Sequence, residues 1–205
     1  MICFLDSDDQ WSRKKLERQL SSFERNKKYL ISHTREIWYR RGEHLNQKKK
    51  HIPKSGDVFF QNLQLCAVGM STVMVRRKIF DSYGLFDETM QCCEDYEFWL
   101  RIGGKEQFLL IDEQLTIKNG GRDDQVSYMN RVGMDIYRIY ALEKTIERTD
   151  ISCLKKRELL RECIRRCRIY ASGCKKHGKI EEAVCYREKL ENYKIKLKRD
   201  FYELG

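Results

Sequence analysis

The stretch Ile2-Cys3-Phe4-Leu5-Asp6-Ser7-Asp8-Asp9 decides the fold class, because an apolar run passes directly into three carboxylates. A buried strand that ends in clustered aspartates is typical of α/β enzymes that hold a divalent cation beside a phosphate. Carboxylate oxygens are the hard ligands that Mg²⁺ or Mn²⁺ prefers, and the end of the strand fixes their direction. Asp6 and Asp8 alternate along an extended backbone, so both can approach one ion only if the chain turns after Leu5.

Helix capping is an alternative interpretation of the same aspartates. A helix is expected over Trp11–Lys27, and either Asp9 or Ser12 lies where its N-cap residue would stand. The apolar residues that recur on one face of this helix are Leu16, Leu20 and Phe23. Both interpretations can hold together, with Asp6 and Asp8 reserved for a metal and a neighbour for the cap.

The composition describes a globular chain of 205 residues, which suggests one domain or one domain with an appendage. One proline and twelve glycines favour long regular elements over disorder. Nine cysteines, two of them adjacent at Cys92 and Cys93, form no secreted framework and indicate reduced thiols in the cytoplasm. No apolar run is long enough to cross a bilayer.

The net charge of +10 is concentrated in the stretch Trp38–Lys54 and in the C-terminal third. Such charge attracts nucleic acid, anionic lipid or phosphorylated substrates, although in the C-terminal third solvated helix faces are the simpler interpretation. The sequence has no helix-turn-helix, zinc or aromatic-platform motif, so we expect no nucleic-acid partner. The Trp38–Lys54 stretch instead favours contact with a phosphorylated lipid carrier at a membrane surface.

The chain divides into a mixed α/β part, residues 1–128, and a purely helical part, residues 129–205. Strands are expected over Lys28–Thr34, Glu36–Tyr39, Phe108–Ile111 and Leu115–Lys118, and Val68–Arg76 alternates apolar and small residues. Helices are expected over Arg77–Tyr83, stopped at Gly84, and over Asp95–Ile102.

The helical part shows apolar residues at a period of 3.6, with a break at His177-Gly178. The region Tyr170–Leu190 resembles half of a tetratricopeptide repeat. One helical hairpin cannot bury its own apolar face, so it is expected to pack on the first part, on a partner protein or on a second copy. Cys163, Cys167 and Cys174 are expected to be core residues, because helical spacing holds Cys163 and Cys174 roughly 16 Å apart, too far for one zinc ion.

A second group of carboxylates lies in two nearby segments. These are Phe86-Asp87-Glu88 and Glu94-Asp95-Tyr96-Glu97-Phe98-Trp99-Leu100-Arg101. Asp95 lies near a helix N-terminus, where the dipole favours the ionised carboxylate. An ionised carboxylate beside a substrate hydroxyl is what a general base requires. Capping and surface charge explain the same residues equally well from composition alone.

Three segments together resemble family-2 glycosyltransferases with the A-type fold. The Asp-x-Asp segment is Leu5–Trp11, the acceptor-side segment is Ser71–Arg77 with Gly84–Glu88, and the Glu-Asp motif is Glu94–Arg101. They follow the family's order and approximate spacing. The resemblance implies a partial A-type fold, a mixed sheet flanked by helices, with a C-terminal helical extension. Residues 1–128 would be the C-terminal portion of the catalytic domain.

The resemblance also implies roles for individual residues. Asp6 and Asp8 would bind the ribose and diphosphate of a nucleotide-sugar donor through Mn²⁺ or Mg²⁺. Asp95 would deprotonate the acceptor hydroxyl in an inverting transfer, while Glu94 and Asp87 would shape the acceptor site. Trp99 and Arg101 of the same helix are expected to lock it against the core instead of touching substrate.

Residues 118–127 resemble the late active-site loop of the family, in which many members carry a histidine that reaches the metal or diphosphate. This chain carries Arg122 there. Arginine cannot ligate a cation, but it can hold a phosphate with two parallel hydrogen bonds. Arg122 is therefore expected to bind the donor diphosphate.

The family builds its nucleotide pocket before the Asp-x-Asp strand, and the sequence predicts that this half is missing. We therefore expect weak sugar-nucleotide binding. The leading function is transfer of a hexose or related sugar to a glycan or lipid-linked acceptor in polysaccharide assembly, in the cytoplasm or at the inner face of the membrane. The alternative is a truncated, inactive transferase remnant that acts as a binding or scaffold protein.

Overall fold

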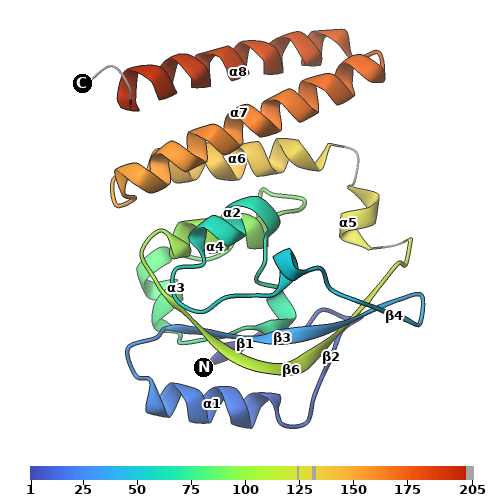
Figure 1. The fold of residues 1–205 in the computed structure, drawn as a ribbon, viewed down its shortest axis with the longest axis vertical. Coiled ribbons are helices and arrows are strands. Elements are labelled where there is room, and N and C mark those ends of the chain that lie inside the picture. The colour runs from blue at the N-terminus through green and yellow to red at the C-terminus, as the bar shows by residue number, and fades with distance from the viewer. Residues whose placement is uncertain (124, 131–132, 202–205) are drawn as a thin grey trace.

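The computed structural model describes residues 1–123, 125–130 and 133–201, so Asp124 of the expected late loop and parts of the expected helical extension lie outside it. A six-stranded mixed sheet runs in the order β1-β5-β3-β6-β2, and β4 pairs with β3 (Figure 1). The strands are β1 (Ile2–Cys3), β2 (Gln10–Trp11), β3 (Ile31–Arg40), β4 (Glu43–Leu45), β5 (Met74–Val75) and β6 (Phe108–Gly120). The expected fold class, a mixed sheet flanked by helices with a helical C-terminal part, is confirmed.

Helices cover both faces of the sheet and form a further layer beyond it (Figure 1). The helices are α1 (Lys15–Arg25), α2 (Phe59–Leu65), α3 (Lys78–Tyr83), α4 (Glu94–Gly103), α5 (Val126–Met129), α6 (Met134–Ile146), α7 (Cys153–Lys176) and α8 (Ile180–Phe201). Two 3₁₀ turns are η1 (Lys49–His51) and η2 (Met70–Thr72). Gly84 ends α3 with a φ of 80°, as the sequence predicts.

The centre of the sheet is a long parallel pair, β3 with β6. Four short strands are expected from the sequence, yet they form two continuous ones. The register shifts on either side of Arg35, which pairs with Gln114, so the breaks in the apolar pattern mark a β-bulge and not the ends of strands. The β3–β6 pair extends from Phe108, which lies in the core, to Gly120, which lies at the candidate site.

The buried face of α1 differs from the expected one. Leu16 and Leu20 are 47% and 45% exposed, whereas Lys15 and Gln19 are buried beside Phe23. The reason is that the polar groups are satisfied inside the protein: the Lys15 ammonium donates to the Gln19 amide oxygen (2.7 Å). The Gln19 amide nitrogen donates to the Thr72 carbonyl (3.0 Å). The expectation that Leu16 and Leu20 face the core is therefore wrong.

One apolar core lies between the sheet and α4, and Phe98, Trp99 and Ile102 of that helix are fully buried in it. Arg101 donates to the Glu97 carboxylate and to the carbonyls of Tyr83 and Leu85. The sequence prediction that Trp99 and Arg101 lock this helix in place is confirmed. The first turn of α4, which carries Glu94 and Asp95, is thereby fixed relative to the sheet.

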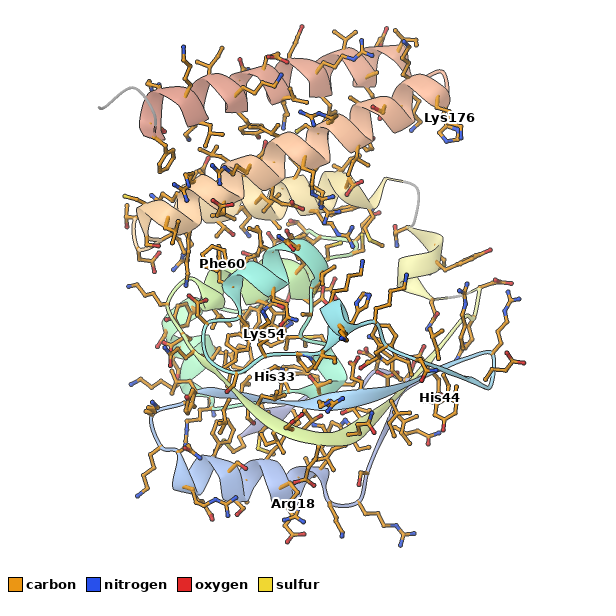
Figure 2. The ribbon with its side chains drawn as sticks, in the orientation of Figure 1. Arg18, His33, His44, Lys54, Phe60 and Lys176 are labelled. Atoms are coloured by element: carbon orange, nitrogen blue, oxygen red, sulfur yellow. The ribbon has the colours of Figure 1, made fainter. Side chains whose placement is uncertain are left out.

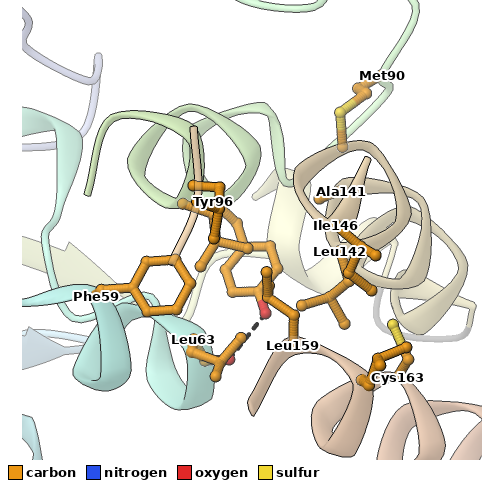
Figure 3. Close-up of a cluster of buried hydrophobic side chains, with 12 residues drawn as sticks. Phe59, Leu63, Met90, Tyr96, Ala141, Leu142, Ile146, Leu159 and Cys163 are labelled. Atoms are coloured by element: carbon orange, nitrogen blue, oxygen red, sulfur yellow. Dashed lines mark hydrogen bonds between the residues drawn. The ribbon is translucent and has the colours of Figure 1, made fainter. Parts of the chain in front are cut away.

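A second core joins α2 and α4 to the helical layer formed by α6, α7 and α8 (Figure 3). The Tyr96 hydroxyl donates to the Leu63 carbonyl (2.8 Å) inside it. Gly178 stands between α7 and α8 with a φ of 74°, at the break that the sequence predicts. Cys163, Cys167 and Cys174 are buried, as expected.

Because the helical layer shares a core with α2 and α4, a domain boundary between residues 128 and 129 stays a prediction. No helix in the part of the chain that the structure describes is long and apolar enough to cross a membrane.

Candidate functional site

The aspartate segment turns sharply after β1. The Asp9 amide donates to the Asp6 carbonyl (3.0 Å), which closes a turn after Leu5, the condition under which Asp6 and Asp8 can approach one ion. Ser71, which is buried in η2, holds this segment in place through two hydrogen bonds. Its hydroxyl accepts the Asp6 backbone N–H (3.0 Å), and its carbonyl accepts the Trp11 indole N–H (2.7 Å). The segment is therefore held by a residue sixty-five positions away, which no local pattern could reveal.

The end of β6 and the residues after it hold the other side of the aspartate segment. The Gln125 amide donates to Asp8 Oδ2 (2.7 Å), and the Asn119 amide group donates to the Asp8 carbonyl (2.9 Å). The Asn119 backbone N–H donates to Asp9 Oδ1 (3.3 Å), while Asp9 Oδ2 is buried without a partner among the described residues.

Lys14 stands at the N-cap of α1 without a side-chain cap, so Asp9 does not cap this helix. The capping alternative is wrong for Asp9.

Asp95 lies in the first turn of α4 beside α2. Its Oδ1 accepts the Tyr96 backbone N–H (2.6 Å), and its Oδ2 accepts the thiol of Cys66 at 3.4 Å. Burial raises the pKa of Asp95, while the Tyr96 amide, the Cys66 thiol and the Lys118 ammonium oppose the rise. The negative charge of Asp6 also raises the pKa of Asp95.

The same site includes Glu94 and Lys118. Burial raises the pKa of Glu94, and the negative charges of Asp95 and Asp6 add to the effect. Burial alone would lower the pKa of Lys118, but Glu36 and three aspartates, Asp9, Asp6 and Asp95, raise it above its ordinary value. Lys118 is thus the cation that balances this group of carboxylates.

The sequence predicts Lys118 at the end of a strand and at the start of the late active-site loop, but it assigns this residue no role. The alternation along β6 offers a weak signal, because Lys118 and the buried Thr116 lie on the same face of the strand. Asn119 and Gln125 lie in that predicted loop and Ser71 opens the predicted acceptor-side segment, but none of them was given a role, and Cys66 was missed. Their contacts depend on tertiary structure and leave no mark in the local sequence.

The remaining predicted site residues have other contacts. Asp87 accepts the Lys144 ammonium (2.6 Å), the Tyr140 hydroxyl (3.2 Å) and the Thr89 hydroxyl (2.6 Å). The hydrogen bond from Lys144 lowers the pKa of Asp87 well below its ordinary range. Asp87 therefore ties the α3–α4 loop to α6, and its role at an acceptor site stays a prediction. Arg122 is exposed just beyond β6, and its contact with a diphosphate also stays a prediction.

The carboxylates of Asp6 and Asp8 suit a hard divalent cation as two of its ligands. Among the described residues, no three His, Cys, Asp or Glu side chains are arranged to hold a metal ion. Mg²⁺ sites in enzymes commonly use one or two carboxylates and complete the shell with water and substrate phosphates. The donor set is therefore compatible with a cation that binds together with a phosphorylated ligand.

Comparison with known proteins gives one family model that matches, described as glycosyl transferase family 2, over residues 1–84. An uncharacterized glycosyltransferase of Rickettsia felis is 36% identical over 121 residues, which are 56% of this chain and 19% of that protein. One of Rickettsia conorii has the same identity and coverage, and one of Rickettsia bellii is 33% identical over 135 residues, 63% of this chain and 18% of that protein. The chain spans about a fifth of the length of these relatives.

Proposed function

We propose that the chain, whose residues 1–84 match the model of glycosyl transferase family 2, contributes a sugar-transfer site. The donor is a nucleotide sugar, and the acceptor is a hydroxyl of a glycan or a lipid-linked glycan. The observation that carries the proposal is the turn of residues 6–9, which Ser71 and Gln125 hold in place, together with Asp95 in the first turn of α4. A residue suited to the donor and a residue suited to base catalysis lie in one site, although they are far apart in sequence.

In the proposed reaction, Asp95 accepts the proton of the acceptor hydroxyl as that oxygen attacks the anomeric carbon of the donor. The new C–O bond forms as the bond to the nucleoside diphosphate breaks, and the diphosphate leaves with the bonding electrons. Attack from the opposite side inverts the anomeric configuration. The raised pKa of Asp95 supports the role, because a carboxylate with a higher pKa is a stronger base.

Asp6 and Asp8 would hold Mn²⁺ or Mg²⁺, which neutralises charge on the leaving diphosphate. Asp8 is positioned for this by Gln125, and Asp6 by Ser71. The positive charge of Lys118 opposes the rise in pKa that burial causes at Asp9 and Asp95. Arg122 is proposed to contact the outer phosphate oxygens, and Glu94 and Asp87 to border the acceptor.

The test is a screen of nucleotide sugars for transfer or hydrolysis, comparing the wild-type chain with Asp95→Asn and Asp6→Asn. We expect Asp95→Asn to lower kcat roughly 10²–10⁴-fold and Asp6→Asn to weaken cation-dependent binding of the nucleotide diphosphate. Asp112→Asn, on the exposed side of β6, is the control and should change neither. Equal turnover by wild type and Asp95→Asn would remove Asp95 from the base role.

A binding or scaffold role is the second candidate, and exposed apolar side chains on α8 favour it. Ile180, Val184 and Ile195 are 57%, 46% and 64% exposed and could contact a partner. The occupant would be a partner protein or a second copy of the chain. Light scattering across a concentration series, with Ile195→Lys as the variant, would detect self-association, and a monomer at every concentration would exclude it.

A further inference from the structure

The hairpin that follows β3 carries a large excess of positive charge. We define the basic hairpin as residues 38–54, which comprise the end of β3, β4 and η1. Its cations are Arg40, Arg41, Lys48, Lys49, Lys50 and Lys54, all exposed, and its acidic residue is Glu43. No acidic side chain within the described ranges lies at ion-pairing distance from these six cations. Their field is therefore not neutralised within the protein.

Exposed apolar groups lie among these charges. Leu45 in β4 is 43% exposed, and Ile52, next to η1, is 37% exposed. The Trp38 ring packs against the His51 ring with 5.2 Å between centroids, which braces η1 against β3. Cations interleaved with exposed aliphatic side chains are typical of elements that lie in the interface of an anionic bilayer.

The basic hairpin is joined directly to the candidate site. The Arg41 backbone N–H donates to the Gly120 carbonyl (3.0 Å), and its guanidinium donates to the Gly121 carbonyl (3.2 Å). Gly121 has a φ of 92°, and a Cβ there would lie 2.9 Å from the Arg40 side chain. The Gly121 N–H donates to Gln125, which in turn holds Asp8. A surface bound by the hairpin would therefore lie beside the aspartate segment.

We propose that the basic hairpin docks this protein on an anionic lipid surface, with its lysines against the headgroup phosphates and Leu45 and Ile52 at the acyl boundary. Charge complementarity identifies the partner as a polyanion, and the aliphatic side chains favour lipid over nucleic acid. Single-stranded nucleic acid is bound through aromatic side chains that stack on its bases, whereas the exposed apolar side chains here, Leu45 and Ile52, are aliphatic. Docking is separate from transfer chemistry, so it can hold even if the proposed transfer reaction does not.

The test is co-sedimentation of the full chain with vesicles of phosphatidylcholine alone and of phosphatidylcholine with phosphatidylglycerol. We expect binding only to the anionic vesicles and its loss at high salt, because exposed charges are screened. Reversing three charges in Lys48→Glu/Lys49→Glu/Lys50→Glu should lower the partition coefficient on the order of a hundredfold. Leu45→Ser should weaken binding less, because it removes one shallow apolar contact.

The matched control reverses three lysines at the turn between α7 and α8, Lys175, Lys176 and Lys179. All three are exposed, and Figure 2 shows Lys176 in the helical layer, far along the molecule from His44 in the basic hairpin. This control changes the net charge equally, so it should bind like wild type. An equal loss of binding in both variants, or binding of a DNA duplex with equal affinity, would overturn the proposal. Circular dichroism checks folding, and a Lys→Gln triple replaces the reversal if it unfolds.

Discussion

The thiol of Cys66 donates a hydrogen bond to the Asp95 carboxylate, with 3.4 Å between Sγ and Oδ2. Cys66 is the C-cap of α2 with a φ of 47°, and Cys93 is the N-cap of α4 with a φ of 63°. Non-glycine residues in this left-handed region cost free energy and persist where the surroundings enforce them. Two helix ends in such a conformation thus meet at the candidate base.

The first prediction is that Cys66→Ala raises the pKa of Asp95. Burial raises the pKa of Cys66 well above 9, so the thiol stays protonated and donates to the ionised carboxylate. Removing a donor worth about 1 kcal/mol destabilises the charged form. Cys66→Ser keeps a hydroxyl donor and should restore the wild-type titration, measured by carboxyl ¹³C NMR. Cys153→Ala, at an exposed thiol, is the control. An unchanged Asp95 titration in Cys66→Ala would show that the thiol does not act on the base.

The second prediction concerns acid stability and rests on His33, which is buried against Phe108 (Figure 2). Its Nε2–H donates to the Lys54 carbonyl (2.9 Å), and Nδ1 has no described partner. Burial lowers the pKa of His33 to about 4. In the unfolded chain the pKa of His33 is near 6.5. Between pH 4 and pH 6.5 the unfolded chain therefore binds more protons than the folded protein. The contribution of His33 to stability is complete above pH 6.5 and falls as the pH decreases toward 4.

For His33 we expect a loss of about 3 kcal/mol across this pH range. His33→Gln, which keeps an amide donor for the Lys54 carbonyl, should remove that part of the pH dependence. Urea unfolding at a series of pH values measures it, and His177→Gln at an exposed position serves as the comparison. Parallel curves for wild type and His33→Gln would contradict the assignment.

The sequence predicts the helices and strands well, because they are local features, whereas the roles of the acidic site residues stay predictions. The stop at Gly84 and the break at Gly178 follow from glycine, which adopts the left-handed backbone conformation that ends a helix. The α1 face was mistaken because helical spacing alone does not say which stripe is buried. Lys15 and Gln19 are buried at low cost once each finds a polar partner.

The partners of the site residues could not be predicted, because they come from remote segments. Ser71 meets Asp6, and Gln125 meets Asp8 across 117 positions. Lys118 gains its role only because the sheet brings four carboxylates around it. Such contacts depend on the strand order, in which β6 lies between β3 and β2, and no periodicity in the sequence encodes that order.

The third prediction concerns the buried pair formed by Arg101 and Glu97, whose side chains are 10% and 1% exposed. The guanidinium binds both carboxylate oxygens, at 2.9 and 2.8 Å, and reaches the Leu85 carbonyl at 2.9 Å. Arg101→Met leaves Glu97 buried with only Lys144 nearby, at 3.5 Å. We expect a loss of about 3–5 kcal/mol in the free energy of unfolding. Arg101→Lys keeps the charge but not the two-pronged geometry, so it should recover only part of that loss.

Replacing both partners distinguishes the pair's own contribution from the penalty of an unpaired charge. If desolvation of Glu97 causes the loss, Glu97→Met/Arg101→Met should be more stable than Arg101→Met alone, because no buried charge remains. Lys144 would keep Asp87 as its partner. Denaturant unfolding of the single and double variants measures the coupling, and Arg35→Met, which breaks the exposed pair with Asp112, should cost about 0–1 kcal/mol. A double variant no more stable than Arg101→Met would instead assign the loss to the hydrogen bonds that Arg101 makes to the α3–α4 loop.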